Sequence, residues 1–314
     1  MATGVGGAER YYENMDMYFA RVFSNGAEVL GTGFTTGTTF YVSSAVTGGD
    51  GRSPQAAIST IDAAIGLCTA NKGDRIYVMP GHTETVTAAA GVALDVAGVT
   101  IIGLGRGSAR PTVNFTTAVG ASFAVTAANC WVENILFTGG IDALTNPISV
   151  AAADFALVNC EWRDVTGQAT DVILTTAAAD RLLVRYHRHD GATAAGANSA
   201  IAIVGGDRIV IDGFNIDGNF AVGCIDVRTT ATTDLEIRNG FARTRNAADI
   251  FLIDTVTAST GMIGPNISIR VNDNAANVTE AMTGATFVYF QNISIVNTAG
   301  EVGLNTNITA TVDI

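Results

Sequence analysis

Val210-Ile-Asp-Gly-Phe214 is one of a series of short apolar runs that recur along the second half of the chain. The central residues of these runs fall 26, 26, 27, 26 and 26 positions apart, at Val132, Val158, Val184, Ile211, Ile237 and Ile263. A second series keeps nearly the same period, at Val125, Val150, Leu174, Ile203, Val227 and Ile253. A period of this size, sustained over several units, indicates a repeat architecture.

The composition of the runs indicates strands. Each run has four to seven residues, is rich in Val, Ile, Phe and Thr, and is closed by Gly, Asn or Asp. These residues favour short strands that end in tight turns. Two or three such strands in a unit of about 26 residues are typical of one coil of a parallel β-helix. We therefore predict an all-β fold, a parallel β-helix solenoid over residues 39–295.

The N-terminal third predicts a short helix that covers the open end of the solenoid. Ser53 is a good N-cap, and Pro54 suits the first helical position. Apolar residues then repeat with helical spacing, at Ala57, Ile58, Ile61, Ala64, Ile65 and Cys68. Lys72-Gly73-Asp74 ends the element before the next strand.

The same region resembles the opening segment of the right-handed parallel β-helix proteins of the pectate-lyase-like superfamily. The residues that carry the resemblance are Phe40-Tyr-Val42, Gly49-Asp-Gly51, Ser53-Pro54, Thr60-Ile61, Gly73-Asp-Arg-Ile-Tyr-Val-Met-Pro-Gly81 and Glu84. The resemblance implies the right-handed coil. This superfamily includes polysaccharide lyases, glycoside hydrolases and bacteriophage virion surface proteins, and the chain is most similar to the last group. The motif identifies a fold and leaves the activity open.

The charge pattern excludes several classes of partner. The net charge is −12, and Lys72 is the single lysine, so no basic stripe follows a nucleic-acid backbone. Every apolar run is too short to span a membrane, and the first residues lack the pattern of a secretory signal. We expect a protein that matures in the cytoplasm of a host cell.

The four cysteines, Cys68, Cys130, Cys160 and Cys224, have no metal-binding spacing. We therefore expect buried thiols with no metal and no cofactor.

The densest polar group in the repeat contains Asp212, Asp217 and Asp226, with Arg228 and Arg238. The three aspartates are weak candidates for catalysis. The residues that follow the first series of run centres form a column of Glu133, Asn159, Arg185, Asp212 and Arg238. This column places Asp212 between two arginines, which favours a structural ion-pair ladder over a catalytic Asp212. Arg228 and Asp254 are predicted to form a second surface pair.

Two further motifs have a structural and a functional interpretation. His187 and His189 lie on one face of a predicted strand, and we interpret them as a solvated strand end and not as acid–base or metal-binding groups. His82 is predicted to be a turn residue. Trp162, within Glu161-Trp-Arg-Asp164, either stacks on a sugar ring or lies at the edge of a coil beside ion pairs. We favour the coil-edge interpretation.

Residues 1–38 lie outside the repeat and are predicted to form an arm. Tyr11, Met15, Tyr18, Phe19 and Val22 share one face of a predicted helix, and the full set of expected contact residues adds Tyr12 and Phe23. Such a face either braces the same chain or binds another subunit. Residues 296–314 end in a strand-like stretch, which we expect to close the solenoid against a neighbouring copy because an open strand edge invites pairing. The resemblance to phage proteins implies a homo-oligomer, such as a trimer.

These patterns support two functional hypotheses of different classes. The first is a non-enzymatic virion structural protein of a bacteriophage, such as a capsid decoration subunit, fibre or tail component. It would assemble in the host cytoplasm through its arm, with other virion subunits and a surface glycan as partners. The second is a polysaccharide lyase, a glycoside hydrolase or a receptor-binding tailspike.

Overall fold

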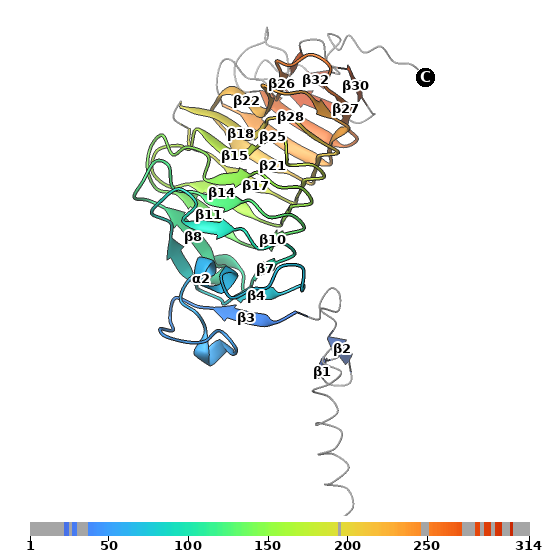
Figure 1. The fold of residues 1–314 in the computed structure, drawn as a ribbon. Coiled ribbons are helices and arrows are strands. Elements are labelled where there is room, and N and C mark those ends of the chain that lie inside the picture. The colour runs from blue at the N-terminus through green and yellow to red at the C-terminus, as the bar shows by residue number, and fades with distance from the viewer. Residues whose placement is uncertain are drawn as a thin grey trace, which may run out of the picture.

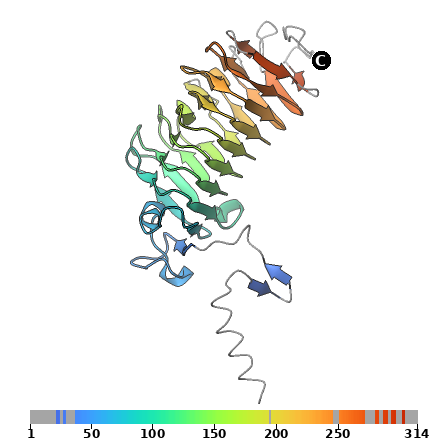
Figure 2. The ribbon, with the colours of Figure 1, turned by 45° about the vertical axis from the view of Figure 1, so that its right-hand side comes forward.

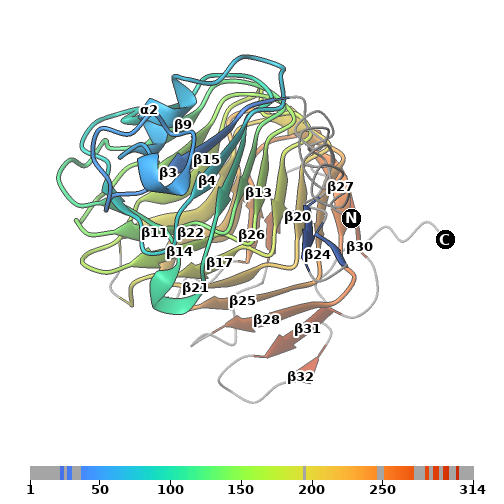
Figure 3. The ribbon, with the colours of Figure 1, turned by 90° about the horizontal axis from the view of Figure 1, so that it is seen from below.

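A computed structural model shows the chain as a stack of coils with strands on three sides (Figures 1 and 2). It describes residues 37–193, 196–245 and 251–271, together with the short strands at 22–24, 27–29, 280–282, 286–289, 293–296 and 302–303. Seen from below, successive coils lie one behind another around a common axis (Figure 3). Within the described residues the architecture is a parallel β-solenoid, as the repeat predicts.

Sheet 1 is the first side of the solenoid, and its ten strands are all parallel. They are β3 (Thr39–Val42), β4 (Arg75–Val78), β7 (Thr100–Gly103), β10 (Trp131–Glu133), β13 (Ala156–Val158), β16 (Leu183–Arg185), β20 (Val210–Asp212), β24 (Leu235–Arg238), β27 (Thr260–Ile263) and β30 (Thr286–Tyr289). Aligned interior residues of neighbouring strands are 25 to 31 positions apart from Ile76 to Ile263. The predicted coil of about 26 residues is confirmed.

Sheet 2 follows sheet 1 in each coil. Its strands are β5 (Thr83–Thr85), β8 (Thr112–Phe115), β11 (Leu136–Gly139), β14 (Glu161–Asp164), β17 (Arg188–Asp190), β21 (Asn215–Gly218), β25 (Gly240–Thr244), β28 (Ile267–Val271), β31 (Ile293–Val296) and β32 (Val302–Gly303). All neighbours are parallel except β32, which returns antiparallel to β31.

Sheet 3 completes the coil. Its strands are β6 (Val92–Leu94), β9 (Phe123–Val125), β12 (Ile148–Val150), β15 (Asp171–Thr175), β18 (Ala197–Ile203), β22 (Phe220–Val227), β26 (Leu252–Asp254) and β29 (Glu280–Met282). Two small pairs lie outside the three sheets, β1 (Val22–Ser24) with β2 (Ala27–Val29) and β19 (Gly206–Asp207) with β23 (Thr232–Thr233).

The register corrects the predicted columns at three places. In sheet 1, Leu157 and not Val158 is aligned with Val132 and Val184, and Val158 lies beside Glu133 and Arg185 on the outer face. In sheet 3, Thr175 and Asp254 occupy the inward column. Leu174 and Ile253, which the apolar pattern placed there, face outward and are partly exposed. Because strand side chains alternate, a shift of one residue reverses the face.

The corner between sheets 1 and 2 is built from left-handed residues. Asn134, Asn159, Asn239 and Asn266 have φ values of 57°, 49°, 52° and 59°. Asparagine tolerates this conformation better than most residues. The Asn266 amide donates to Asn239 Oδ1 at 3.0 Å, and the Asn134 amide donates to the Gly103 carbonyl at 2.7 Å. Asn159 therefore belongs to this corner, not to the predicted column of Glu133 and Arg185.

The predicted capping helix is split into two short elements, the 3-10 helix η1 (Pro54–Ala56) and α2 (Ile61–Ile65). Ser53 caps η1 as predicted. Ala57 then adopts an extended conformation, and Ile58 forms a bridge with Val42 of β3, which interrupts the helix. Within α2, Ile61, Ala64 and Ile65 are buried in the same core as the first coils.

Only short strands and residues 37–38 of the two terminal regions are among the described residues. Val22 lies in strand β1, so the predicted helical face is wrong at this residue. Phe23, an expected contact residue outside that face, lies in the same strand. Tyr11, Tyr12, Met15, Tyr18 and Phe19, and the stretch 307–314, lie outside the described residues. Among the described residues, no helix is long and apolar enough to cross a membrane.

The register predicts costs of very different size for truncating two adjacent residues. Ile173 points inward between Ile148 and Ile201, whereas Leu174 faces outward. Ile173→Ala should lower the free energy of unfolding by about 2–5 kcal/mol because it leaves a cavity in the core. Leu174→Ala should lower it by about 1 kcal/mol or less. Urea unfolding of both variants measures the difference, and a larger loss for Leu174→Ala would contradict this register.

Candidate functional site

The cluster on sheet 1 centres on Asp212. Arg185 Nη2 lies 3.0 Å from Asp212 Oδ2, Arg238 Nε lies 3.5 Å from Oδ1, and the Asn239 amide donates to Oδ1 at 2.9 Å. Burial alone would raise the pKa of Asp212, but the hydrogen bonds from Asn239, Arg185 and Arg238 outweigh it and lower the pKa. Both carboxylate oxygens are occupied, so the predicted ladder across three coils is present and holds an ionised, fully paired Asp212.

The outer face of sheet 2 carries two more paired carboxylates. Asp217 accepts hydrogen bonds from Arg245 Nε at 2.7 Å and Nη2 at 2.6 Å, and from Arg243. These bonds lower the pKa of Asp217 although burial opposes ionisation. Glu161 lies 3.0 Å from Arg110 Nη1 and 2.5 Å from Arg163 Nη2. Like Asp212, these carboxylates are paired with arginines; the partners lie in the same coil, in an adjacent coil or, for Arg110, two coils earlier.

The cluster on sheet 3 is different because two carboxylates share one guanidinium. Arg228 Nη2 lies 2.6 Å from Asp171 Oδ2, and Arg228 Nη1 lies 3.1 Å from Asp226 Oδ2. Asp171 is 57 positions before Arg228 and comes two coils earlier in the stack. Asp171 Oδ1 is buried and makes no hydrogen bond within the described part of the chain. The side chain of Arg228 is 27% exposed, against 6% for Asp171 and 2% for Asp226.

Desolvation raises the pKa of Asp226, and the nearby carboxylates of Asp171 and Asp254 raise it further against the opposing charge of Arg228. Asp254 is fully buried in the inward column of sheet 3 and has a raised pKa because it is desolvated. The prediction that Asp254 pairs with Arg228 on the surface is therefore wrong. The structure brings Asp226 together with Asp171, a residue that the sequence analysis did not single out, and separates both from Asp212 and Asp217.

The two strand histidines are core residues, which corrects their interpretation as a solvated strand end. His187 and His189 are 1% and 2% exposed. His189 occupies the inward column of sheet 2 between Trp162 and Ile216, and its ring lies 5.3 Å from that of Phe220. Burial lowers the pKa of His187 to about 4 and that of His189 to about 3. Both rings are neutral at neutral pH and are poor candidates for acid–base chemistry.

His82 follows the turn at Pro80-Gly81, as predicted, but its ring is buried with Nε2 3.2 Å from Glu84 Oε2. Among the described residues, no group of three or more His, Cys, Asp or Glu side chains is arranged to hold a metal ion. All four cysteines are free thiols; Cys130, Cys160 and Cys224 are buried, as expected, whereas Cys68 is partly exposed. Burial raises the pKa of the Cys160 thiol to about 12.

The two tryptophans have opposite environments. Trp162 is fully buried inside the solenoid, and its indole donates to Asp164 Oδ1 at 3.0 Å. Both interpretations of Trp162, as a sugar-stacking group and as a coil-edge residue, are therefore wrong. Trp131 lies on the outer face of sheet 1 and is partly exposed. The sequence analysis missed Trp131 because the repeat is defined by the apolar centre of each run, here Val132, and Trp131 lies just before that centre.

Comparison with known proteins places the fold and leaves the activity open. No family model and no curated protein matches the sequence. The solved structure of a rhamnogalacturonan lyase is similar over 87% of this chain and 91% of that chain, with a TM-score of 0.52 and 9% sequence identity. The chain shares a parallel β-helix fold with that structure. An identity this low shows shared architecture only, and the likeness to bacteriophage surface proteins stays a prediction from the sequence.

The buried histidines predict a sensitivity to acid. In the unfolded chain they titrate near 6.5, whereas in the folded chain their pKa values are about 4 and about 3. Below about pH 6.5 the unfolded chain therefore binds more protons than the folded chain. The free energy of unfolding falls as the pH is lowered through this range. The melting temperature of His189→Leu should drop less between pH 7 and pH 4 than that of the natural sequence. An equal drop in both proteins would show that His189 does not contribute.

Proposed function

We propose that this protein binds a polysaccharide and hydrolyses its glycosidic bonds at the cluster of Asp171, Asp226 and Arg228 on sheet 3. The observation that carries the proposal is the pair of buried carboxylates held by one guanidinium, with the pKa of Asp226 raised. The similarity in fold to a rhamnogalacturonan lyase supports a polysaccharide as the class of substrate by analogy.

The environment of Asp226 suits a general acid. Its raised pKa keeps a proton on the carboxyl group to a higher pH than an ordinary aspartate would. Glycoside hydrolysis uses two carboxyl groups, one that protonates the leaving oxygen and one that acts as base or nucleophile. In this proposal Asp226 protonates the leaving oxygen and Asp171 acts as base or nucleophile. Asp171 Oδ1 accepts no hydrogen bond from the described residues, so its lone pairs are not engaged there.

The net charge of the cluster favours hydrolysis over elimination. Two carboxylates and one guanidinium leave at most one negative charge, which favours the positive, oxocarbenium-like transition state of glycoside hydrolysis. Elimination from a uronic acid develops negative charge beside the sugar carboxylate, and this cluster has no surplus cation to balance it. Arg228 is the most exposed member, so a sugar hydroxyl meets its guanidinium first.

Two variants test the acid and the base. Asp226→Asn and Asp171→Asn should each reduce the release of reducing ends from neutral and acidic polysaccharides by about 100-fold or more. Asp212→Asn is the matched control, because Asp212 is also bound to arginines but lies on sheet 1. Asp212→Asn should keep the hydrolysis rate of the natural sequence. The rate of the natural sequence should decline as the pH rises through the raised pKa of Asp226.

Three results would contradict the proposal. They are the absence of any new reducing ends, the appearance of unsaturated sugars as the main product, and a loss of turnover in Asp212→Asn equal to that in Asp226→Asn. The last result would place the chemistry on sheet 1 and overturn the structural role of the Asp212 ladder.

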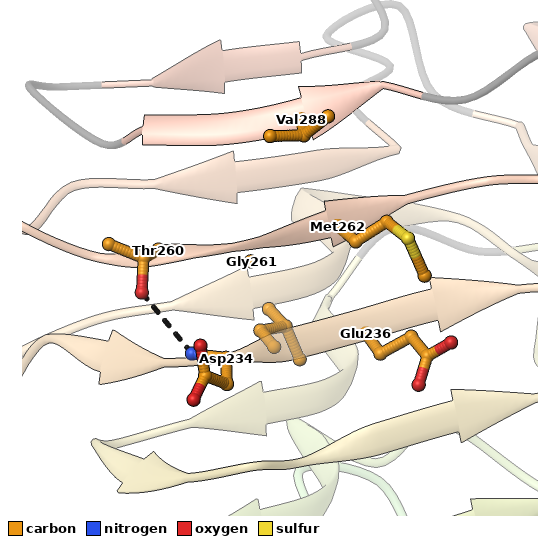
Figure 4. A pocket seen from close by; sticks show the side chains of 7 residues that line it. Asp234, Glu236, Thr260, Gly261, Met262 and Val288 are labelled. Atoms are coloured by element: carbon orange, nitrogen blue, oxygen red, sulfur yellow. Dashed lines mark hydrogen bonds between the residues drawn. The ribbon is translucent and has the colours of Figure 1, made fainter.

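We propose a second candidate, a non-enzymatic structural subunit that associates with further copies of itself, as the first hypothesis from the sequence has it. It is supported by a hollow of about 650 Å³ on sheet 1 near the C-terminal end of the stack (Figure 4). Met262 and Val288 present apolar side chains there, with Asp234, Glu236 and Thr260 around them. Val288 is 53% exposed, and a neighbouring subunit would cover it.

Val288→Asp tests this second candidate. If the hollow is a contact between copies, light scattering after size exclusion should show an oligomer for the natural sequence and a smaller species for the variant, because the new carboxylate would be buried at the contact. Val119→Asp is the control, since Val119 is 54% exposed and lies elsewhere. A monomer for the natural sequence, or equal oligomers for all three proteins, would argue against this contact.

A further inference from the structure

Trp131 stands on the outer face of sheet 1 at a hollow of about 570 Å³. The aligned residues on the neighbouring strands are Thr100 on one side and Ala156 on the other. Both are small, so neither covers the indole ring with a bulky side chain. The indole N–H donates to Glu133 Oε2 at 3.1 Å, which fixes the orientation of the ring. A partly exposed indole of fixed orientation thus lines the hollow.

The lining of the hollow combines apolar with polar side chains, and the polar residues Arg75, Thr100, Glu133 and Asp154 are called its rim. Ile102 and Val158 lie beside Glu133 in the adjacent outward column. Arg75 and Thr100 supply donors at the rim, and the carboxylates of Glu133 and Asp154 supply acceptors. An apolar surface with a few converging polar groups is typical of a small-molecule site, and the volume lies within the usual range for one.

The charges at the rim nearly cancel. Asp154 is neutralised by Arg181, whose Nε and Nη2 lie 2.5 and 2.7 Å from its two carboxylate oxygens. Arg75 and Glu133 carry one charge of each sign. A negatively charged ligand would lie close to the carboxylates of Glu133 and Asp154. The lining has no excess of positive charge to attract such a ligand.

From this geometry we infer that the hollow at Trp131 binds a neutral sugar unit of a glycan, which stacks its apolar ring face on the indole. The many hydroxyl groups of a neutral sugar both donate and accept hydrogen bonds, which matches the mixed rim. The site lies on sheet 1, whereas the proposed catalytic cluster lies on sheet 3. It does not depend on cleavage, and a protein with no hydrolytic activity would still bind through it.

Tryptophan fluorescence tests the site directly, because the chain has two tryptophans and Trp162 is buried. Cellohexaose, maltohexaose and xylohexaose are the neutral probes, and hexagalacturonate is the anionic one. At least one neutral probe should change the emission and protect it from acrylamide quenching. Trp131→Phe, which leaves only Trp162, should give no response. No change with any neutral probe, or a full response in Trp131→Phe, would overturn the inference.

Calorimetry then measures affinity. Trp131→Ala should weaken binding of the responding neutral probe by about tenfold, which corresponds to about 1.4 kcal/mol. Trp131→Tyr keeps a smaller aromatic face and provides a second variant if Trp131→Ala does not fold; it should weaken binding of that probe by about threefold. Unchanged affinity in Trp131→Ala or in Trp131→Tyr, or tighter binding of hexagalacturonate than of every neutral probe, would contradict a neutral stacked sugar.

The catalytic variant Asp226→Asn separates this site from the proposed hydrolysis. If both proposals hold, Asp226→Asn binds the neutral probe with the affinity of the natural sequence and does not release reducing ends. Binding that persists without any hydrolysis in the natural sequence supports the Trp131 site and removes the enzymatic proposal. Hydrolysis without a fluorescence response at Trp131 would support the enzymatic proposal and remove the Trp131 site.

Discussion

The hydrogen-bonded pairing of each coil with the next is the constraint on which the rest of this structure depends. Parallel strands pair along three sheets, so each coil satisfies the backbone groups of its neighbours. The pairing also fixes which side chains face inward. Because alternate residues point to opposite faces, one register decides both the composition of the core and the pattern of charges on the surface.

The stacking explains why distant residues meet. Asp171 and Arg228 are 57 positions apart, yet they form one cluster because two intervening turns of the chain bring them onto the same face. Arg185, Asp212 and Arg238 meet in the same way on sheet 1. The three outer faces nevertheless differ in chemistry. Sheets 1 and 2 hold carboxylates saturated by arginines, whereas on sheet 3 a single arginine serves two buried carboxylates.

The period and the strand composition were sufficient to predict the solenoid, because both reflect the backbone repeat. They were not sufficient for the register of every coil. At Leu157-Val158 two aliphatic residues are adjacent, and at Thr175 and Asp254 the inward position is polar, so hydropathy selected the wrong neighbour. His187 and His189 were placed in solvent for the same reason. The burial of His189 among Trp162, Ile216 and Phe220 depends on contacts between coils that local sequence does not contain.

The Asp212 ladder followed from the sequence because it needs only the coil length and the sign of each charge. The Asp171 cluster did not, since Arg228 spans two coils and no pattern of adjacent columns reveals that reach. The Trp131 site could not be predicted either, because it depends on the small side chains of Thr100 and Ala156, which only the register places beside Trp131.

The asparagine corner between sheets 1 and 2 has a consequence for how such a chain tolerates change. From β10 onward this corner takes only one to three residues, whereas most of the links between sheets 2 and 3 take six or more. An inserted segment at the asparagine corner would displace the left-handed residue that makes the bend. The longer links absorb insertions without moving the strands on either side. New surface features in descendants of this chain should therefore accumulate along the edge where sheet 2 meets sheet 3, leaving the asparagine edge unaltered.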